Sequence, residues 1–139
     1  MADLLGEIAV PDLEDPLFKP FWEGMKAGEL RIQHCPASNI TYWPPRFRCT
    51  TSGSTEFEWI KVEPKGRVYS FVTVGKSMIK GFEAPYHIGL VELDENPGIR
   101  IVGIIESPTA PRIGEMVYGT YVQAGPAGEL YLLRWHSAD

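Results

Sequence analysis

Apolar and polar residues alternate through most of the second half of the chain. The stretch 67–76, RVYSFVTVGK, is typical, because successive side chains of a strand point to opposite faces. The same period-two pattern recurs over the stretches 86–94, 99–106, 116–123 and 129–135, which turns rich in Gly and Pro separate. Five short strands joined in this way predict a mainly β fold with a small, closed or partly closed five-stranded Greek-key barrel.

The first half has a different pattern. Leu30–Cys35 alternates and predicts a strand, 57–62 predicts another, and the residues 36–54 between them are typical of loops. One or two short amphipathic helices are expected over 15–27. Asp15-Pro16 resembles a helix start, Pro20 begins a second short helix, and Gly28 is a natural stop.

Composition and charge narrow the classes of function. The 139 residues carry 18 acidic and 13 basic side chains, a net charge of −5, whereas binding to a phosphate backbone requires a surplus of Lys and Arg. The longest aliphatic run, 101–105, is too short to cross a membrane, and the acidic start lacks the features of a signal peptide. We therefore expect a soluble, cytoplasmic protein that contacts neither nucleic acid nor membrane.

Two tetrads in the first half resemble the knuckles of a zinc site. Cys35-Pro36-Ala37-Ser38 and Cys49-Thr50-Thr51-Ser52 each open with cysteine and place serine where the second cysteine of Cys-x-x-Cys would stand. Two complete knuckles at this spacing would indicate a structural zinc ribbon. Since a serine hydroxyl holds its proton tightly, it is a poor zinc ligand, and we predict that the ribbon is degenerate and binds no zinc.

Two alternatives for this segment stay open at the sequence level. His34 is a candidate third ligand, although neighbouring strand side chains point to opposite faces. A Cys35–Cys49 disulfide is the other, although a reducing cytosol disfavours it. The segment Tyr42–Phe47, rich in aromatic residues and proline, would stiffen a ribbon without metal.

Groups capable of catalysis are scattered along the chain. A thiol–imidazole pair would need one of the two cysteines beside His34, His87 or His136, but both cysteines occupy the tetrad positions and are more simply structural. Gly75-Lys76-Ser77 lacks the glycine spacing of a phosphate-binding loop. We therefore predict no catalytic residue.

Several short motifs occur in an order that resembles a known family. They are PFWEG (20–24), GELRIQHC (28–35), WPPR (43–46), Cys49, GST (53–55), Trp59, GRVYSF (66–71), FEAPY (82–86), LVELDE (90–95) and IG (113–114). Over about residues 16–125 the chain resembles the zinc-ribbon/OB-fold proteins, long catalogued as a domain of unknown function and associated with acyl-CoA. The departures are Ser38 and Ser52, so the family's zinc is not carried over.

The resemblance implies N-terminal helices, a rubredoxin-like ribbon and a C-terminal OB-fold. We accordingly divide the chain into an N-terminal extension with helices (1–34), a degenerate zinc ribbon (35–62) and an OB-fold (63–139). Members of the family are small partner subunits of thiolase-like enzymes, namely thiolases, acyltransferases and aldolases that cut acyl-CoA side chains, and some bind acyl-CoA hydratases. The partner carries the nucleophile, so this chain is expected to be a non-catalytic subunit.

Two sets of residues are expected to serve such a role. Coenzyme A needs cations for its phosphates and apolar surface for its pantetheine arm, and the candidates are Arg46, Arg48, Lys76, Lys80 and Phe82. Partner docking favours exposed aromatic residues, and the candidates are Phe21, Trp22, Trp43 and Phe47.

Two other hypotheses compete with the accessory subunit. One is a stand-alone module, monomeric or homodimeric, that binds acyl-CoA or another small ligand through its OB-fold. The other is an OB-fold that stacks single-stranded nucleic acid on Tyr69, Phe71, Tyr118 and Tyr121, which the net charge of −5 opposes.

Overall fold

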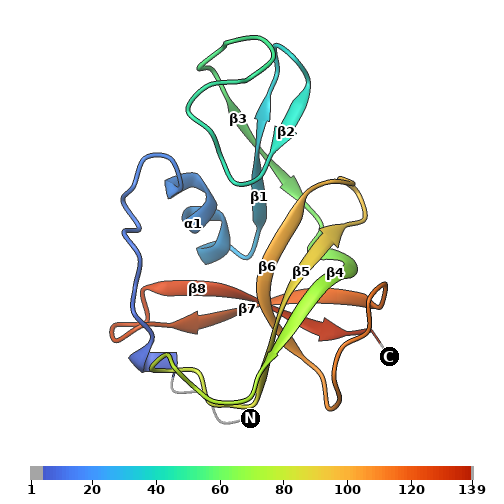
Figure 1. Cartoon of the computed structure of the whole chain (residues 1–139). Coiled ribbons are helices and arrows are strands. Elements are labelled where there is room, and N and C mark those ends of the chain that lie inside the picture. The colour runs from blue at the N-terminus through green and yellow to red at the C-terminus, as the bar shows by residue number, and fades with distance from the viewer. Residues whose placement is uncertain (1–4, 139) are drawn as a thin grey trace.

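The computed structural model describes residues 5–138 of the chain and contains a barrel, a smaller sheet and a short helix (Figure 1). In chain order the elements are the 3-10 turn η1 (Leu5–Glu7), α1 (Lys19–Lys26), β1 (Leu30–Cys35), β2 (Ile40–Tyr42), β3 (Glu58–Val62), β4 (Lys65–Val74), β5 (Tyr86–Leu93), β6 (Arg100–Glu106), β7 (Met116–Ala124) and β8 (Leu130–Ser137). The fold is mainly β, as predicted.

Strands β4 to β8 form a closed barrel in the order β4-β5-β6-β8-β7. All neighbours are antiparallel except β6 and β8, which run parallel. This confirms the predicted five-stranded barrel, and each of its strands lies within about two residues of the stretch that alternation marked. A closed barrel leaves no unpaired sheet edge.

Glycines make room for large side chains inside this small barrel. A Cβ built on Gly103 would lie 2.9 Å from Cδ1 of Trp135, and one on Gly119 would lie 2.7 Å from Cδ1 of Leu133. Gly89 faces Ile105 in the same way. Trp135 fills the centre and is fully buried. In the barrel interior, large side chains therefore pack against glycines, which leave space for them.

The smaller sheet has the order β2-β1-β3, with both pairs antiparallel. It stands above the barrel in Figure 1 and carries the two tetrads in its loops. Strand β1 starts at Leu30, so this sheet begins before residue 35, where the sequence analysis placed the start of the ribbon. Strand β2 was not predicted, because it has only three residues and exists through its pairing with β1.

The N-terminal region contains a single α-helix. The helix starts at Lys19 with Pro20 in its first turn and ends before Gly28, whose φ of 75° is left-handed, as expected for a helix stop. Asp15-Pro16 starts no helix. Instead the amide of Leu17 donates to the Asp15 carboxylate at 3.0 Å, which closes a turn.

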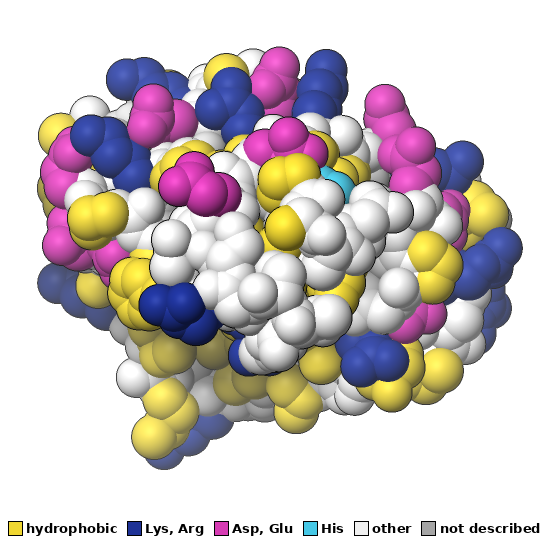
Figure 2. Space-filling model, turned by 90° about the horizontal axis from the view of Figure 1, so that it is seen from above, with side chains coloured by type: hydrophobic (Ala, Val, Ile, Leu, Met, Phe, Trp, Pro, Cys, Tyr) yellow, Lys and Arg dark blue, Asp and Glu magenta, His cyan; other side chains and the backbone are white. Residues whose placement is uncertain are grey.

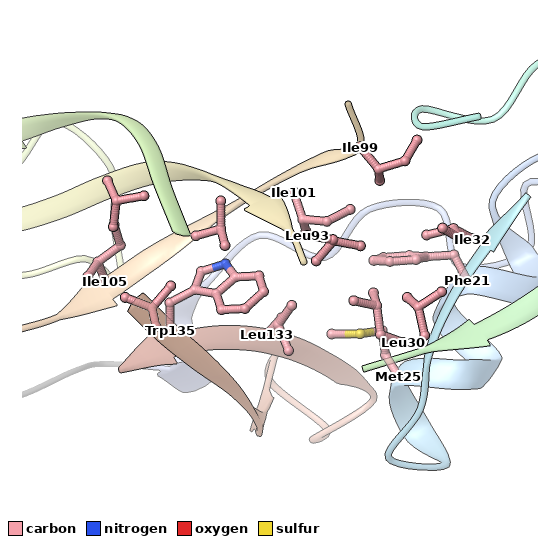
Figure 3. Packing of buried hydrophobic residues seen from close by; sticks show 14 residues of the cluster. Phe21, Met25, Leu30, Ile32, Leu93, Ile99, Ile101, Ile105, Leu133 and Trp135 are labelled. Carbon is pink, nitrogen blue, oxygen red and sulfur yellow. The ribbon is translucent and has the colours of Figure 1, made fainter. Parts of the chain in front are cut away.

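One hydrophobic core joins helix, ribbon sheet and barrel. Phe21 and Met25 of α1 and Leu30 and Ile32 of β1 belong to the same cluster as Trp135 (Figure 3). Phe21 was expected to be exposed, and that expectation is wrong: its ring is 7% exposed, because α1 turns it onto the core. Among residues 5–138, no helix combines the length and apolar character needed to cross a membrane.

Candidate functional site: an apolar cavity between helix and barrel

A cavity of about 330 Å³ lies where α1 and the ribbon meet the barrel. Aromatic rings form much of its wall, and they come from four separate parts of the chain: Phe18, Phe21, Trp22, Trp43, Phe82 and Tyr86. Aliphatic residues of β5, β6 and β8, such as Ile88, Val102 and Leu132, complete it. A volume of this size lies in the range of small-molecule sites, about 300–1,000 Å³.

The helix side of the cavity is built by ring packing. The rings of Phe21 and Trp22 meet edge to face at 5.0 Å, and Trp43 from the ribbon lies 4.5 Å from Phe21. Trp43 also meets Phe18 edge to face at 6.1 Å. Phe21 and Trp22 are successive residues, and both line the cavity. The contacts between these rings fix the ribbon against the helix.

The barrel side includes the loop 75–85 between β4 and β5. Ser77 Oγ–H bonds to the carbonyl of Ile79, at 3.1 Å, and to that of Phe82, and the Phe82 amide donates to Ile79 at 3.3 Å. The Phe82 ring lies 5.7 Å from Tyr86, at the start of β5. These bonds hold Ile79 and Phe82 toward the cavity, so the loop forms part of its wall.

Arg134 is the charged residue in the cavity wall. It belongs to β8, is 8% exposed, and its Nη1 lies 3.1 Å from Oε1 of Glu106. A buried guanidinium is tolerated when a carboxylate pairs with it. The pair leaves the wall close to neutral. Sequence analysis missed Arg134, although its place between Leu133 and Trp135 in an otherwise apolar strand was a usable signal.

The structure separates the predicted coenzyme A residues. Phe82 lines the cavity, and Lys76 and Lys80 are exposed in the same loop. Arg46 and Arg48 do not line it. The Arg46 guanidinium lies over the Tyr42 ring, 5.2 Å from its centroid, and Arg48 Nη1 donates to the carbonyl of Gly53. Both arginines therefore make contacts within the ribbon.

The predicted docking aromatics also divide. Trp22 and Trp43 are half-buried in the cavity wall beside the buried Phe21. Phe47, in contrast, is 77% exposed at the ribbon loop. Figure 2, seen from the ribbon end, shows acidic and basic side chains interspersed around this face. An even mixture of charges is not the basic groove that a nucleic-acid strand requires.

The four tetrad positions converge in the ribbon. Ser38 Oγ lies 3.1 Å from Cys49 Sγ, Ser52 Oγ lies 3.5 Å from Cys35 Sγ, and the Tyr42 hydroxyl lies 3.3 Å from Cys49 Sγ. Hydrogen bonds from Ser38 and Ser52, with a further one from Tyr42, lower the pKa of Cys49 to about 5. The hydroxyls of Ser38, Ser52 and Tyr42 are thus hydrogen-bonded to the two sulfurs.

These residues do not fit the zinc that a ribbon of this type implies. Only two cysteine sulfurs stand where a complete ribbon would have four thiolates; the other two positions are hydroxyls, and a hydroxyl that keeps its proton cannot act as an anionic ligand. His34 cannot complete the set. Its Nδ1 pairs with Thr41 Oγ1 at 3.2 Å and its Nε2 lies 3.9 Å from Glu58, on the opposite face from Cys35. The alternative of His34 as a third ligand is therefore wrong.

The other candidate groups are also accounted for. Cys35 and Cys49 are free cysteines, so the structure does not contain the alternative Cys35–Cys49 disulfide. His87 pairs with Thr73 at 2.9 Å and His136 with Thr120 at 2.7 Å, on separate parts of the barrel. Within the described residues, no group of three or more His, Cys, Asp or Glu side chains is arranged to hold a metal ion.

Comparison with known proteins identifies the family. Residues 59–125 match the family described as ChsH2, C-terminal OB-fold domain. A DUF35 domain-containing scaffold protein of Methanocaldococcus jannaschii is 37% identical over 97 residues, which are 67% of each chain. The chain belongs to the DUF35 family. The resemblance noted from the ordered motifs is thereby confirmed.

Larger relatives contain the same unit. The DUF35 chain is 32% identical over 126 residues to the alpha subunit of a 3-oxo-4,17-pregnadiene-20-carboxyl-CoA hydratase of Mycobacterium tuberculosis. It is also 32% identical over 117 residues to a probable enoyl-CoA hydratase alpha subunit of Thermomonospora curvata. The matches cover 82% of this chain but only 40% and 36% of those subunits.

Solved structures support the whole architecture. A chain of the Ltp2-ChsH2(DUF35) aldolase superposes with a TM-score of 0.83 at 29% identity, covering 94% of this chain and 100% of the other. A DUF35 protein of unknown function from Sulfolobus solfataricus gives a TM-score of 0.61 at 15% identity, which supports the fold alone. Helix, ribbon and barrel are therefore a shared arrangement.

Proposed function

We propose that this chain is a non-catalytic accessory subunit of an acyl-CoA-processing complex, docked on an enzyme of the thiolase superfamily. The observation that carries the proposal is the superposition on all of a DUF35 chain from the Ltp2-ChsH2(DUF35) aldolase, at a TM-score of 0.83. The scaffold protein and the two hydratase alpha subunits support the same role, because their names combine scaffolding with acyl-CoA chemistry. A hydratase-like partner is the variant that the last two relatives favour.

The structure supports particular roles within this complex. Phe47 is the exposed aromatic residue that docks the partner. Trp22 and Trp43 contribute to docking from the cavity wall. Lys76 and Lys80, in the loop that also carries Phe82, supply cations for the phosphates of coenzyme A. The proposal places the complex in the cytoplasm, where the free thiols Cys35 and Cys49 stay reduced.

Affinity capture from the native cells tests the docking role. A tagged full-length chain is expected to retain a thiolase-superfamily or hydratase-like protein, identified by mass spectrometry, in a stoichiometric complex. Phe47→Glu should reduce the retained partner at least about tenfold, because an exposed aromatic at an interface contributes strongly to affinity. Ile113→Glu is the matched control, since Ile113 is also exposed, at 65%, but lies on the loop between β6 and β7. Elution of the unmodified chain alone would contradict the proposal.

A stand-alone acyl-CoA-binding module, monomeric or homodimeric, is the second candidate. The apolar cavity of about 330 Å³ favours it, since such a site needs no partner to exist. Size-exclusion chromatography with light scattering, together with the capture experiment, separates the two. A chain that binds ligand tightly but retains no enzyme is the module.

A further inference from the structure

We propose that Cys35 and Cys49 form a binding site for a soft monovalent metal ion, copper(I) being the one that cells use. The site lies in the ribbon, where Cys35 ends β1 on the side away from the barrel (Figure 1). Both side chains are almost completely buried, at 0% and 1% exposed, and both are free cysteines. The site is separate from the apolar cavity between helix and barrel.

The two ribbon loops hold their cysteines by the same backbone arrangement. In each loop the carbonyl of the cysteine accepts a hydrogen bond from the amide four residues later. Asn39 donates to Cys35 at 2.7 Å, and Gly53 donates to Cys49 at 2.9 Å. Both donor residues are left-handed, with φ of 57° and 76°. Two loops of equivalent shape therefore present one sulfur each.

Ser52 shows that the two sulfurs are close together. Its Oγ lies 3.5 Å from Cys35 Sγ, and its amide donates to Cys49 Sγ at 3.5 Å. Because a single residue contacts both sulfurs, the fold brings the two thiols together before any ion binds. A site that is already assembled loses little conformational entropy on binding.

The number and type of ligands select the metal ion. Structural zinc is held by four ligands, and serine hydroxyls that keep their protons do not supply the missing two. Magnesium and calcium prefer oxygen ligands. Copper(I) is a soft ion that thiolates bind, and two thiolates complete a linear coordination. Each thiol that coordinates the ion releases its proton to solvent, and no oxidant or reductant is consumed.

The groups around the sulfurs suit the charge of the complex. One copper(I) ion and two thiolates carry a net charge of −1, and a buried anion needs hydrogen bonds or a nearby cation. The Ser38 and Tyr42 hydroxyls lie 3.1 and 3.3 Å from Cys49 Sγ, and they donate to the sulfur once it has lost its proton. The Arg46 guanidinium, 5.2 Å from the centroid of the Tyr42 ring, adds a positive charge nearby.

Anaerobic titration of the reduced full-length chain with copper(I), in competition with the chromophoric chelator bicinchoninate, tests the site. We expect one copper per chain, no increase in molar mass by light scattering, and X-ray absorption that shows two sulfur neighbours. Silver(I), which is not oxidised in air, should bind with the same stoichiometry. Complete loss of copper to the chelator, copper bound through nitrogen or oxygen, or copper that joins two copies of the chain would overturn the site.

Three variants locate the ion. Cys49→Ser should abolish stoichiometric copper binding, whereas Met78→Leu should leave it unchanged, since Met78 is an exposed sulfur side chain in the loop between β4 and β5. Ser38→Ala keeps both thiols, so it should still bind one copper per chain, about tenfold more weakly because a ligating sulfur loses a hydrogen bond. Equal copper binding by Cys49→Ser and the unaltered chain would refute the location. If Cys49→Ser loses its circular dichroism spectrum, the X-ray absorption of the unaltered chain and of Ser38→Ala decides.

Discussion

At the scale of single residues, Gly103 decides whether the barrel can close around Trp135. A Cβ at this position would meet Trp135 Cδ1 at 2.9 Å and Nε1 at 3.0 Å. We predict that Gly103→Ala lowers the free energy of unfolding by about 1–3 kcal/mol, because overpacking in a close-packed interior forces neighbours to shift. Urea unfolding followed by tryptophan fluorescence measures the change.

The control for this prediction is another glycine. Gly75 is exposed, and an added Cβ there meets nothing within 4 Å. Gly75→Ala should leave stability unchanged or raise it slightly, through the smaller entropy of the unfolded chain. A loss equal to that of Gly103→Ala would show that the effect belongs to glycine replacement in general.

Glu115 makes the stability of the protein depend on pH. Ser137 Oγ–H donates to its carboxylate at 2.6 Å and the Arg112 amide donates at 3.0 Å, and these bonds lower the pKa of Glu115. A lowered folded-state pKa adds stability above the ordinary glutamate pKa of about 4.3, and this stability is lost as the pH falls below it.

We predict that Glu115→Gln is less stable than the parent near pH 7, by less than about 1 kcal/mol because solvent screens the group. The difference should shrink as the pH falls below about 4.3. Thermal unfolding between pH 3 and 7 measures it. Ser137→Ala should change stability in the same direction, and a difference that grows in acid would contradict the assignment.

At the scale of elements, the two ribbon loops bring the four tetrad side chains together as a metal site would. Hydrogen bonds between serine and cysteine connect these side chains. Ser38 and Ser52 lie 3.1 and 3.5 Å from the sulfurs of Cys49 and Cys35. We predict that the double variant Ser38→Cys/Ser52→Cys binds one Co²⁺ or Zn²⁺ per chain, because four converging thiolates form a tetrahedral site. Thiolate-to-cobalt absorption bands and elemental analysis measure binding.

The unaltered chain is the reference for this experiment. It should show no cobalt absorption and no stoichiometric zinc. The double variant should also gain thermal stability on adding zinc, since metal binding contributes to folding free energy. One zinc per chain in the unaltered protein would contradict the prediction that the degenerate ribbon binds no zinc.

At the scale of the whole molecule, Met25 connects the parts. It is 1% exposed and shares a cluster with Leu30 of the ribbon sheet and Leu133 of the barrel (Figure 3). We predict that Met25→Ala destabilises the protein by about 2–5 kcal/mol, the usual result of deleting a buried side chain. Because the core is continuous, ribbon and barrel should lose stability together.

Hydrogen exchange measures that coupling through amides of β1 in the ribbon and β5 in the barrel. Both sets should lose protection by the same free energy in Met25→Ala. Lys26→Ala, at the exposed neighbouring position of α1, should leave both unchanged. Loss of protection in β1 alone would show that the ribbon unfolds independently.

Local patterns predicted much of this architecture. Alternation marked all five barrel strands and β1, because one face of each is buried and the other meets solvent. The helix stop was predicted at Gly28 because glycine adopts a left-handed φ without strain, and its φ of 75° in the structure agrees. Strand β2 and the turn at Asp15-Pro16 were not recognised, since each depends on a hydrogen-bond partner that local sequence does not specify.

The candidate site was predicted only in part. Phe82, Trp22 and Trp43 were selected as separate groups with separate roles, and the fold brings them into one cavity. Arg46 and Arg48 were selected for their charge, but each has a partner within the ribbon. Charge and ring type are properties of a residue, whereas a shared wall depends on which strands and helices meet.

The amino-acid sequence by itself determined the strand periods, the missing zinc ligands and the family motifs, because each is carried by residue types at fixed spacing. The tertiary structure decided that Phe21 turns inward, that His34 faces away from Cys35, and that helix, ribbon and barrel enclose an apolar cavity. These outcomes depend on contacts between residues far apart in the chain. Burial, and with it the identity of the binding surface, is a property of the packed molecule.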